Sequence, residues 1–324
     1  MKKKLAARAA IVREVRAFFE SRGYLEVETP IAIPSPGLDL HLDAFEVVPT
    51  HVEGGATTAD ERRYLSTSPE YQMKRLLCDG HPRIFQITRA FRAGERGERH
   101  NPEFTILELY RSDASPPGAS SAAFSGVEAI MRDTEQLVAR VTGGEVRIGE
   151  RRIDTRPPFV RMPIVEAFER YARTAPSETL RLSIEDEDRF FRLLVEDVEP
   201  ALARLDHAVF VTEYPISQAS LARKKPSDPR VAERFELYVA GVELCNGFGE
   251  LTDAVEQRAR FVHDQHERAR RGKPVYPIDE RFLEALARGM PESGGNAIGL
   301  DRLIAVALGG TAIGDVLAFT ADEL

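Results

Sequence analysis

Residues 91–110 read FRAGERGERHNPEFTILELY, and this stretch decides the architecture of the chain. Its second half, from Phe104 to Tyr110, alternates in the manner of a half-buried strand. The run before it, RIFQITRAFR over Arg83–Arg92, is equally rich in β-forming residues. Because a short and very polar loop joins the two runs, the sequence predicts a hairpin of two antiparallel strands with a charged tip.

The period of two in the second strand predicts which side chains face the core. Leu107 and Leu109 share one face, whereas Phe104, Glu108 and Tyr110 share the other. A carboxylate and a phenol beside an aromatic ring are a suitable lining for a cleft that receives an amine. The loop adds arginines and a histidine that can hold phosphates, although a solvated hairpin tip explains the same residues.

A second hairpin with chemistry is predicted over residues 235–247, FELYVAGVELCNG, whose central Ala-Gly pair forms the turn. In the simplest register Glu236 faces Cys245. The same register pairs Glu243 with Tyr238, so the two carboxylates are diagonal neighbours on one face, about 6–8 Å apart at Cβ. Two such carboxylates can converge on one Mg2+, while carboxylates that simply face water are the alternative.

The composition limits the class of protein. The 324 residues include 44 Lys and Arg against 52 Asp and Glu, which gives a net charge of −8. Broad nucleic-acid binding is therefore not expected, because it requires a clustered surface of lysine and arginine, and the basic runs at residues 223–225 and 268–273 are short. No membrane span and no signal peptide are expected. Two cysteines, Cys78 and Cys245, cannot form a disulfide framework, so we expect a cytoplasmic protein.

Helical and extended patterns are interspersed along the chain. Residues 5–21 predict an amphipathic helix, Tyr24–Thr29 a short strand, and residues 127–141 another helix. The polar stretches 50–62 and 112–126 predict loops. Because hairpin-like pairs replace regular βαβ units, we expect an α+β fold with a mainly antiparallel sheet flanked by helices.

A glycine-rich strand is predicted near the end of the chain, over Ser293–Gly299, SGGNAIG. An apolar helix over residues 300–308 follows, with Asp301 and Arg302 in its first turn. Small residues in the strand let the backbone approach a ligand closely, or else they form a tight junction between helix and strand.

Together these segments resemble the three motifs of a class II aminoacyl-tRNA synthetase catalytic domain. GYLEVETP, within residues 5–30, is similar to motif 1, residues 83–110 to motif 2 and residues 293–308 to motif 3. TSPEYQMKRLL and VELCNGFGELTDA resemble the lysyl-tRNA synthetase branch. The resemblance implies one catalytic domain over residues 1–324, without an N-terminal anticodon-binding domain, because motif 1 begins within about 25 residues of Met1.

The segment YPISQASLA, residues 214–222, resembles a narrower family, the synthetase paralogues that modify elongation factor P. That family activates (R)-β-lysine with ATP and transfers it to a lysine of elongation factor P. The resemblance implies ATP and Mg2+ as cofactors, (R)-β-lysine or lysine as substrate, elongation factor P as partner, and a homodimer without a stable nucleic-acid or membrane partner. A free-standing lysyl-tRNA synthetase-like enzyme and a catalytically silent regulatory paralogue are the alternatives.

Carried over position by position, the resemblance assigns the candidate site. Arg92 matches the motif 2 arginine on the α-phosphate and Arg302 the motif 3 arginine on adenine, so both are the expected catalytic residues. The expected contacts to ATP are Arg92, Gly94, His100, Asn101, Phe104, Glu243, Leu244, Gly299 and Arg302. The expected amino-acid pocket is Ser68, Pro69, Glu70, Glu108, Tyr110, Asn246, Glu250 and Ala297, and the expected metal ligands are Glu236 and Glu243.

Two positions depart from the pattern of the family. Motif 2 usually has an acid two residues after the arginine, where this chain has Gly94 followed by Glu95. Either a backbone contact or the carboxylate of Glu95 would then replace the missing acid. Ala297 stands where lysyl-tRNA synthetases have glycine, a pattern associated with β-lysine. One methyl group in a tight pocket is worth about 1–3 kcal/mol, enough to select between amino acids.

Overall fold

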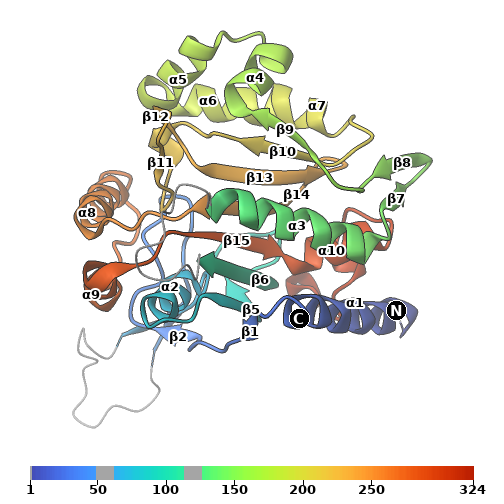
Figure 1. Ribbon diagram of the computed structural model, residues 1–324, viewed down its shortest axis with the longest axis horizontal. Coiled ribbons are helices and arrows are strands. Elements are labelled where there is room, and N and C mark those ends of the chain that lie inside the picture. The colour runs from blue at the N-terminus through green and yellow to red at the C-terminus, as the bar shows by residue number, and fades with distance from the viewer. Residues whose placement is uncertain (1, 49–61, 113–125) are drawn as a thin grey trace.

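An eight-stranded sheet forms the centre of the computed structural model, which describes residues 2–48, 62–112 and 126–324 (Figure 1). The strand order is β1-β5-β6-β15-β14-β13-β10-β9, with antiparallel pairs inside and one parallel pair at each end. The predicted α+β fold with a mainly antiparallel sheet is confirmed. The loops expected at 50–62 and 112–126 lie outside the described residues, apart from residues 62, 112 and 126.

Two hairpins form the middle of the sheet. β5 (Arg83–Phe91) and β6 (Glu103–Ser112) make the first hairpin, while β13 (Arg234–Val239) and β14 (Val242–Gly249) make the second. β15 (Ser293–Gly299) lies between β6 and β14 and pairs antiparallel with both. The glycine-rich strand therefore joins the two chemically rich hairpins into one surface.

The second hairpin does not keep the simplest register. Tyr238 lies opposite Glu243 as expected, but the register then shifts, and Glu236 lies opposite Asn246 rather than Cys245. A β-bulge inserts one extra residue into a strand, which moves every later pairing by one position. The predicted partner of Glu236 is therefore wrong. As a result Asn246 shares the site with Glu236, while Cys245 packs in the main core.

One face of the sheet is covered by α1 (Lys2–Glu20), α3 (Gly126–Thr142) and α10 (Leu300–Ala307), which share the largest hydrophobic core. The first two confirm the helices predicted from the periodicity of apolar residues. The strand expected before Pro30 is shorter than predicted and is confined to β1 (Leu25–Glu26).

The other face carries a second core that is rich in aromatic side chains. Leu109 belongs to the first core and its neighbour Tyr110 to the second, so the alternation predicted for this strand is confirmed. Tyr71 stacks on Phe282 with ring centroids 4.8 Å apart. The helices that contribute to this core are α2 (Glu70–Cys78), α8 (Ala254–Arg270) and α9 (Glu280–Gly289).

Shorter elements complete the described chain, and a third core lies beside β9 and β10. No helix within the described ranges has both the length and the apolar character needed to cross a membrane. The remaining strands are β2 (Ala32–Ile33), β3 (Glu46–Val47), β4 (Arg63–Leu65), β7 (Glu145–Ile148), β8 (Arg151–Asp154), β9 (Val160–Pro163), β10 (Val209–Thr212), β11 (Lys224–Lys225) and β12 (Asp228–Ala232). The remaining α-helices are α4 (Ile164–Ala167), α5 (Pro176–Glu185), α6 (Glu187–Leu193) and α7 (Glu199–Leu202).

Two glycines of β15 are required by close packing. A Cβ atom on Gly294 would lie 2.2 Å from the carbonyl oxygen of Gly126, and one on Gly295 would lie 2.2 Å from Oε1 of Glu250. No side chain fits at these distances. These two glycines therefore allow protein segments to meet, which favours the packing explanation of this strand.

Candidate active site

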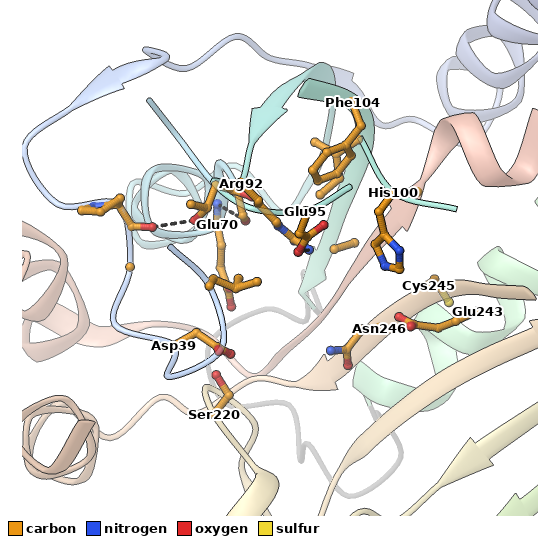
Figure 2. A pocket seen from close by; sticks show the side chains of 18 of the residues that line it. Asp39, Glu70, Arg92, Glu95, His100, Phe104, Ser220, Glu243, Cys245 and Asn246 are labelled. Carbon is orange, nitrogen blue, oxygen red and sulfur yellow. Dashed lines mark hydrogen bonds and ion pairs between the residues drawn. The ribbon is translucent and has the colours of Figure 1, made fainter. Parts of the chain in front are cut away.

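A cavity of about 220 Å³ opens beside the middle of the sheet, next to the segments that carry Asp39 and Ser220 (Figure 2). Residues more than 200 positions apart in the sequence meet around it. The expected site residues that line it are Ser68, Glu70, Arg92, His100, Asn101, Phe104, Glu243, Leu244, Asn246, Ala297, Gly299 and Arg302. Those that do not appear among its described lining residues are Pro69, Gly94, Glu108, Tyr110, Glu236 and Glu250.

Arg92 lines the cavity and lies beside Glu95 (Figure 2). Its guanidinium stands 5.0 Å from the ring centroid of Phe104, and its Nη1 lies 3.5 Å from Oε1 of Glu95. Gly94 has φ +83°, a left-handed backbone conformation that favours glycine. The neighbouring carboxylate of Glu95 therefore faces the arginine, and Gly94 provides the turn that brings it there.

Arg302 and His100 line the cavity side by side. Nη2 of Arg302 lies 2.8 Å from Nε2 of His100, and Nη1 donates to the carbonyl oxygen of Glu243 at 3.0 Å. Burial, together with the positive charge of Arg302, lowers the pKa of His100. The imidazole is therefore neutral at pH 7 and can accept a hydrogen bond from the guanidinium.

The polar loop of the first hairpin is tied to distant parts of the chain. Asn101 donates to the carbonyl oxygen of Glu103 at 2.6 Å and accepts from the backbone N–H of Ala321 at 2.9 Å. Arg99, which also lines the cavity, donates to the carbonyl oxygen of Gly241 at 2.7 Å. The residue list carried over from the family omitted Arg99 and Glu95, although both lie in the charged loop that the sequence marks for phosphates.

Glu236 is held rigidly on the second hairpin. Its carboxylate accepts hydrogen bonds from Arg234 at 2.6 Å, Tyr214 at 2.5 Å and Tyr238 at 2.8 Å. Three donors satisfy much of its capacity, and an arginine remains charged at any physiological pH. Glu236 is thus a fixed anion beside the cavity.

Glu243 has far fewer partners than Glu236. Its side chain is 40% exposed, and its ion-pair partner among the described residues is Arg302, with 3.6 Å between Nη1 and Oε2. Desolvation inside the cavity, followed by the charge of Glu236, raises the pKa of Glu243 to about 7. A divalent cation would relieve this repulsion, so the two carboxylates fit a metal that also takes phosphate oxygens. No group of three or more metal-binding side chains occurs in the part of the chain that the structure describes.

A second cavity of about 590 Å³ adjoins the first. The two share Arg92, Glu243 and Asn246 as lining residues, and Glu236 lines only the second. Asn246 accepts a hydrogen bond from Nε of Arg234 at 3.2 Å. The β-bulge of the second hairpin thus places an amide and two carboxylates where the two cavities meet.

The expected ammonium-binding carboxylates lie in two layers. Ser68 and Glu70 line the cavity, whereas Glu108 is fully buried behind them. Glu108 accepts a hydrogen bond from the Ser68 hydroxyl and another, at 3.1 Å, from the hydroxyl of Tyr110. Burial, followed by the charge of Glu70, raises the pKa of Glu108 to about 8.

A fully buried lysine connects this layer, and the sequence analysis did not include it in the site. Nζ of Lys74 lies 2.6 Å from Oε1 of Glu70 and 2.5 Å from Oε2 of Glu250. Burial raises the pKa of Glu250 to about 7, against the lowering effect of Lys74. The stretch TSPEYQMKRLL places Lys74 four residues after Glu70, and residues four apart on a helix face the same side, so the sequence alone could have indicated this pair.

Comparison with known proteins identifies the family of this chain. Residues 1–323 match the family model of the class II tRNA synthetases (D, K and N). The chain belongs to this family. A relative from Enterobacter sp. (strain 638) is 42% identical over 98% of this chain and 95% of its own length, and it is named elongation factor P–(R)-β-lysine ligase. Relatives from Salmonella paratyphi B and Salmonella schwarzengrund carry the same name, at 40% identity over 98% of this chain and 95% of their own length.

In this member of the family, basic side chains of the two short runs, residues 223–225 and 268–273, form ion pairs with carboxylates. Arg223 pairs with Glu233 at 2.6 Å, and Lys224 and Lys225 pair with Glu256 and Glu213. In the second run Arg268 and Lys273 both contact Asp43, while Arg270 and Arg271 contact Glu267. These basic side chains therefore each have an acidic partner within the described chain.

Proposed function

We propose that this protein is an ATP-dependent ligase that activates (R)-β-lysine, or lysine, as an aminoacyl-adenylate and transfers it to a lysine of elongation factor P. The observation that carries the proposal is one cavity lined both by the arginines expected to bind ATP, Arg92 and Arg302, and by carboxylates, among them Glu70 and Glu243. Near-complete alignment with relatives that are named for this reaction supports the same substrates.

Adenylation requires alignment and neutralised charge more than a side-chain base. Arg92 lines the cavity and would contact the α-phosphate that the substrate carboxylate attacks, and Glu95 would orient its guanidinium. Arg302, held by His100 and by the backbone of residue 243, would bind ATP at the opposite wall. Charge that develops on the phosphate during attack would be stabilised by Arg92.

We propose that Mg2+ binds at Glu243, with Glu236 as the second carboxylate. When bound, the ion supplies positive charge to the phosphate oxygens of ATP. The support is the raised pKa of Glu243, to which burial and then the charge of Glu236 contribute most. The hydrogen bonds of Glu236 would keep that carboxylate in place whether or not a cation is present.

The amino-acid pocket proposed here combines both layers described above. Glu70 faces the cavity, and Glu108 and Glu250 would supply charge from behind it for the two ammonium groups of the substrate. The remaining proposed contacts are Ser68, Pro69, Tyr110, Asn246 and Ala297.

One assay series tests this function. ATP–pyrophosphate exchange is measured with (R)-β-lysine and with α-lysine, and transfer is then measured to elongation factor P and to tRNA. We expect exchange with at least one of the two amino acids, and a mass increase of about 128 Da on elongation factor P from one added lysyl-type group. Efficient charging of tRNA without a mass change on elongation factor P would assign the chain to the lysyl-tRNA synthetase-like alternative.

We also propose a homodimer and a single catalytic domain. The eight strands of the central sheet come from positions between residue 25 and residue 299, which supports a single domain. In this fold class the motif 1 region, here α1 and β1, builds the subunit interface, and Leu25 in it is 53% exposed. Light scattering at micromolar concentration should give twice the mass of 36.1 kDa, and a clean monomer would contradict the dimer.

A further inference from the structure

Lys74 is a buried cation that the proposed reaction has not used. Its side chain is 1% exposed and lies between two carboxylates of the proposed amino-acid pocket, at 2.6 Å from Glu70 and 2.5 Å from Glu250. Burying an ammonium group is costly unless it is paired. Oε1 of Glu250, also buried, has no hydrogen-bond partner among the described residues, so the cluster still has capacity for a further donor.

The charges of this cluster can be compared with those of the proposed substrate. Glu70, Glu108 and Glu250 carry three negative charges when all are ionised, and Lys74 carries one positive charge. Lysine and β-lysine each bring two ammonium groups. With all three carboxylates ionised the cluster carries a net charge of −2, which the two ammonium groups of such a substrate would neutralise.

We propose that Lys74 is a specificity-determining counter-ion that sets the number of ammonium groups the pocket accepts at two. It acts through Glu70 and Glu250 and is a positioning residue, because it does not line the cavity itself. This inference rests on the proposed function, since it takes those carboxylates as the ones that receive the substrate.

The groups that face this cluster come from every element around it. Glu70 lies on α2 with Lys74, Glu108 and Tyr110 lie on β6, and Glu250 follows β14. Arg223 acts on Glu250 from one side, and Arg92 acts on Glu108 from the other. Both arginines stay charged across the working pH range, so the carboxylates are the groups that exchange protons there.

Without substrate, protons take the place of the missing cations. Burial raises the pKa of Glu108 to about 8 and that of Glu250 to about 7, which keeps part of the cluster neutral at pH 7. When an ammonium group enters, a protonated carboxyl releases its proton to the buffer and becomes its ion-pair partner. Each unit of pKa shift corresponds to a tenfold change in equilibrium.

A charge-balanced set of variants tests the role of Lys74. Lys74→Met removes the buried cation, Glu250→Gln removes one buried anion, and the double variant removes both and restores the balance. At pH 7 each single variant should raise the KM for the amino acid about tenfold. The double variant should raise it only about threefold, instead of the roughly hundredfold that additive effects would give.

The pH profile separates this role from a purely structural one. In Lys74→Met the midpoint of the KM profile should move to higher pH by about one unit, because the cation that lowered the pKa of Glu250 is gone. The KM for ATP should stay within about twofold. Lys225→Met, which removes a lysine paired with Glu213 outside the cavity, is the matched control and should change neither constant.

Three results would overturn the proposal. They are additive effects in the double variant, a parallel rise in the KM for ATP and for the amino acid, and a lower KM for the amino acid in Lys74→Met. The last result would mean that Lys74 only competes with the substrate. Absence of exchange in the unmodified protein would instead contradict the proposed function, so the two failures are distinguishable.

Discussion

Two groups of carboxylates lie along the same sheet, and the protein neutralises them differently. On the second hairpin, Glu236 is bound by Arg234 and by two tyrosines, while Glu243 beside it faces the cavity. In the amino-acid pocket, Glu70 and Glu250 share the single ammonium of Lys74. Arginine holds a carboxylate in a fixed fork, whereas lysine is a compact charge that two carboxylates can share.

This difference indicates how each group works. The hairpin group keeps one anion fixed and leaves the other available, an arrangement suited to a cation that accompanies phosphates. The pocket group has Glu108 and Glu250 buried behind the cavity wall, and burial raises the pKa of Glu108 to about 8. In the proposed pocket, such a group would take up a cationic substrate by releasing protons, and its affinity would therefore depend on pH.

The largest effect is expected from Glu243→Gln on the hairpin. The change keeps the shape but removes the charge proposed to hold the cation, so pyrophosphate exchange should fall by about 10²–10³-fold with the fold intact. Glu213→Gln, outside the cavity, is the control. Unchanged exchange at low Mg2+ would show that the hairpin carboxylates do not bind the metal.

The next largest effect is expected from Glu108→Gln in the pocket. Glutamine imitates the protonated carboxyl, so the empty protein should keep its stability, but it cannot ionise when an ammonium group arrives. Loss of this buried ion pair should raise the KM for the amino acid by about 30-fold, from about 2 kcal/mol. Separate titrations of ATP and amino acid measure the effect, and an equal rise in both constants would argue against an ammonium-binding role.

A smaller effect is expected from pH on the unmodified protein. Glu250 and Glu108 have pKa values raised to about 7 and about 8, so both are increasingly ionised as the pH rises. Because the ionised carboxylates bind ammonium groups, the KM for the amino acid should fall by about tenfold between pH 6 and pH 8.5. An amino-acid KM that is flat or rises over this range contradicts the sign of the argument.

The smallest effect is expected from Ala297→Gly. In the sheet Ala297 lies opposite Glu108 on β6 and opposite Asn246 on β14, and it lines the cavity. Removing its methyl group should shift the preference between β-lysine and α-lysine towards α-lysine by about fivefold, within the range for one methyl group in a pocket. The ratio of kcat/KM for the two amino acids measures it, and an unchanged ratio would place the selection elsewhere.

Local patterns in the sequence determined most of the architecture. Alternation along 104–110 placed Leu107 and Leu109 in one core and Tyr110 in the other, because side chains on a strand alternate between faces whatever packs on them. Apolar periodicity located α1 and α3, because one apolar face of a helix is enough to specify it. The motif positions followed from short stretches of neighbouring residues.

Only the tertiary structure decided the details of the site, because they depend on contacts between distant residues. The β-bulge that brings Asn246 beside Glu236 depends on how two whole strands pair. Asp43, the partner of Arg268 and Lys273, comes from a segment far away in the chain. Lys74 lies four residues from Glu70 on one helix, yet its burial depends on Glu250, which no local pattern could place at 2.5 Å.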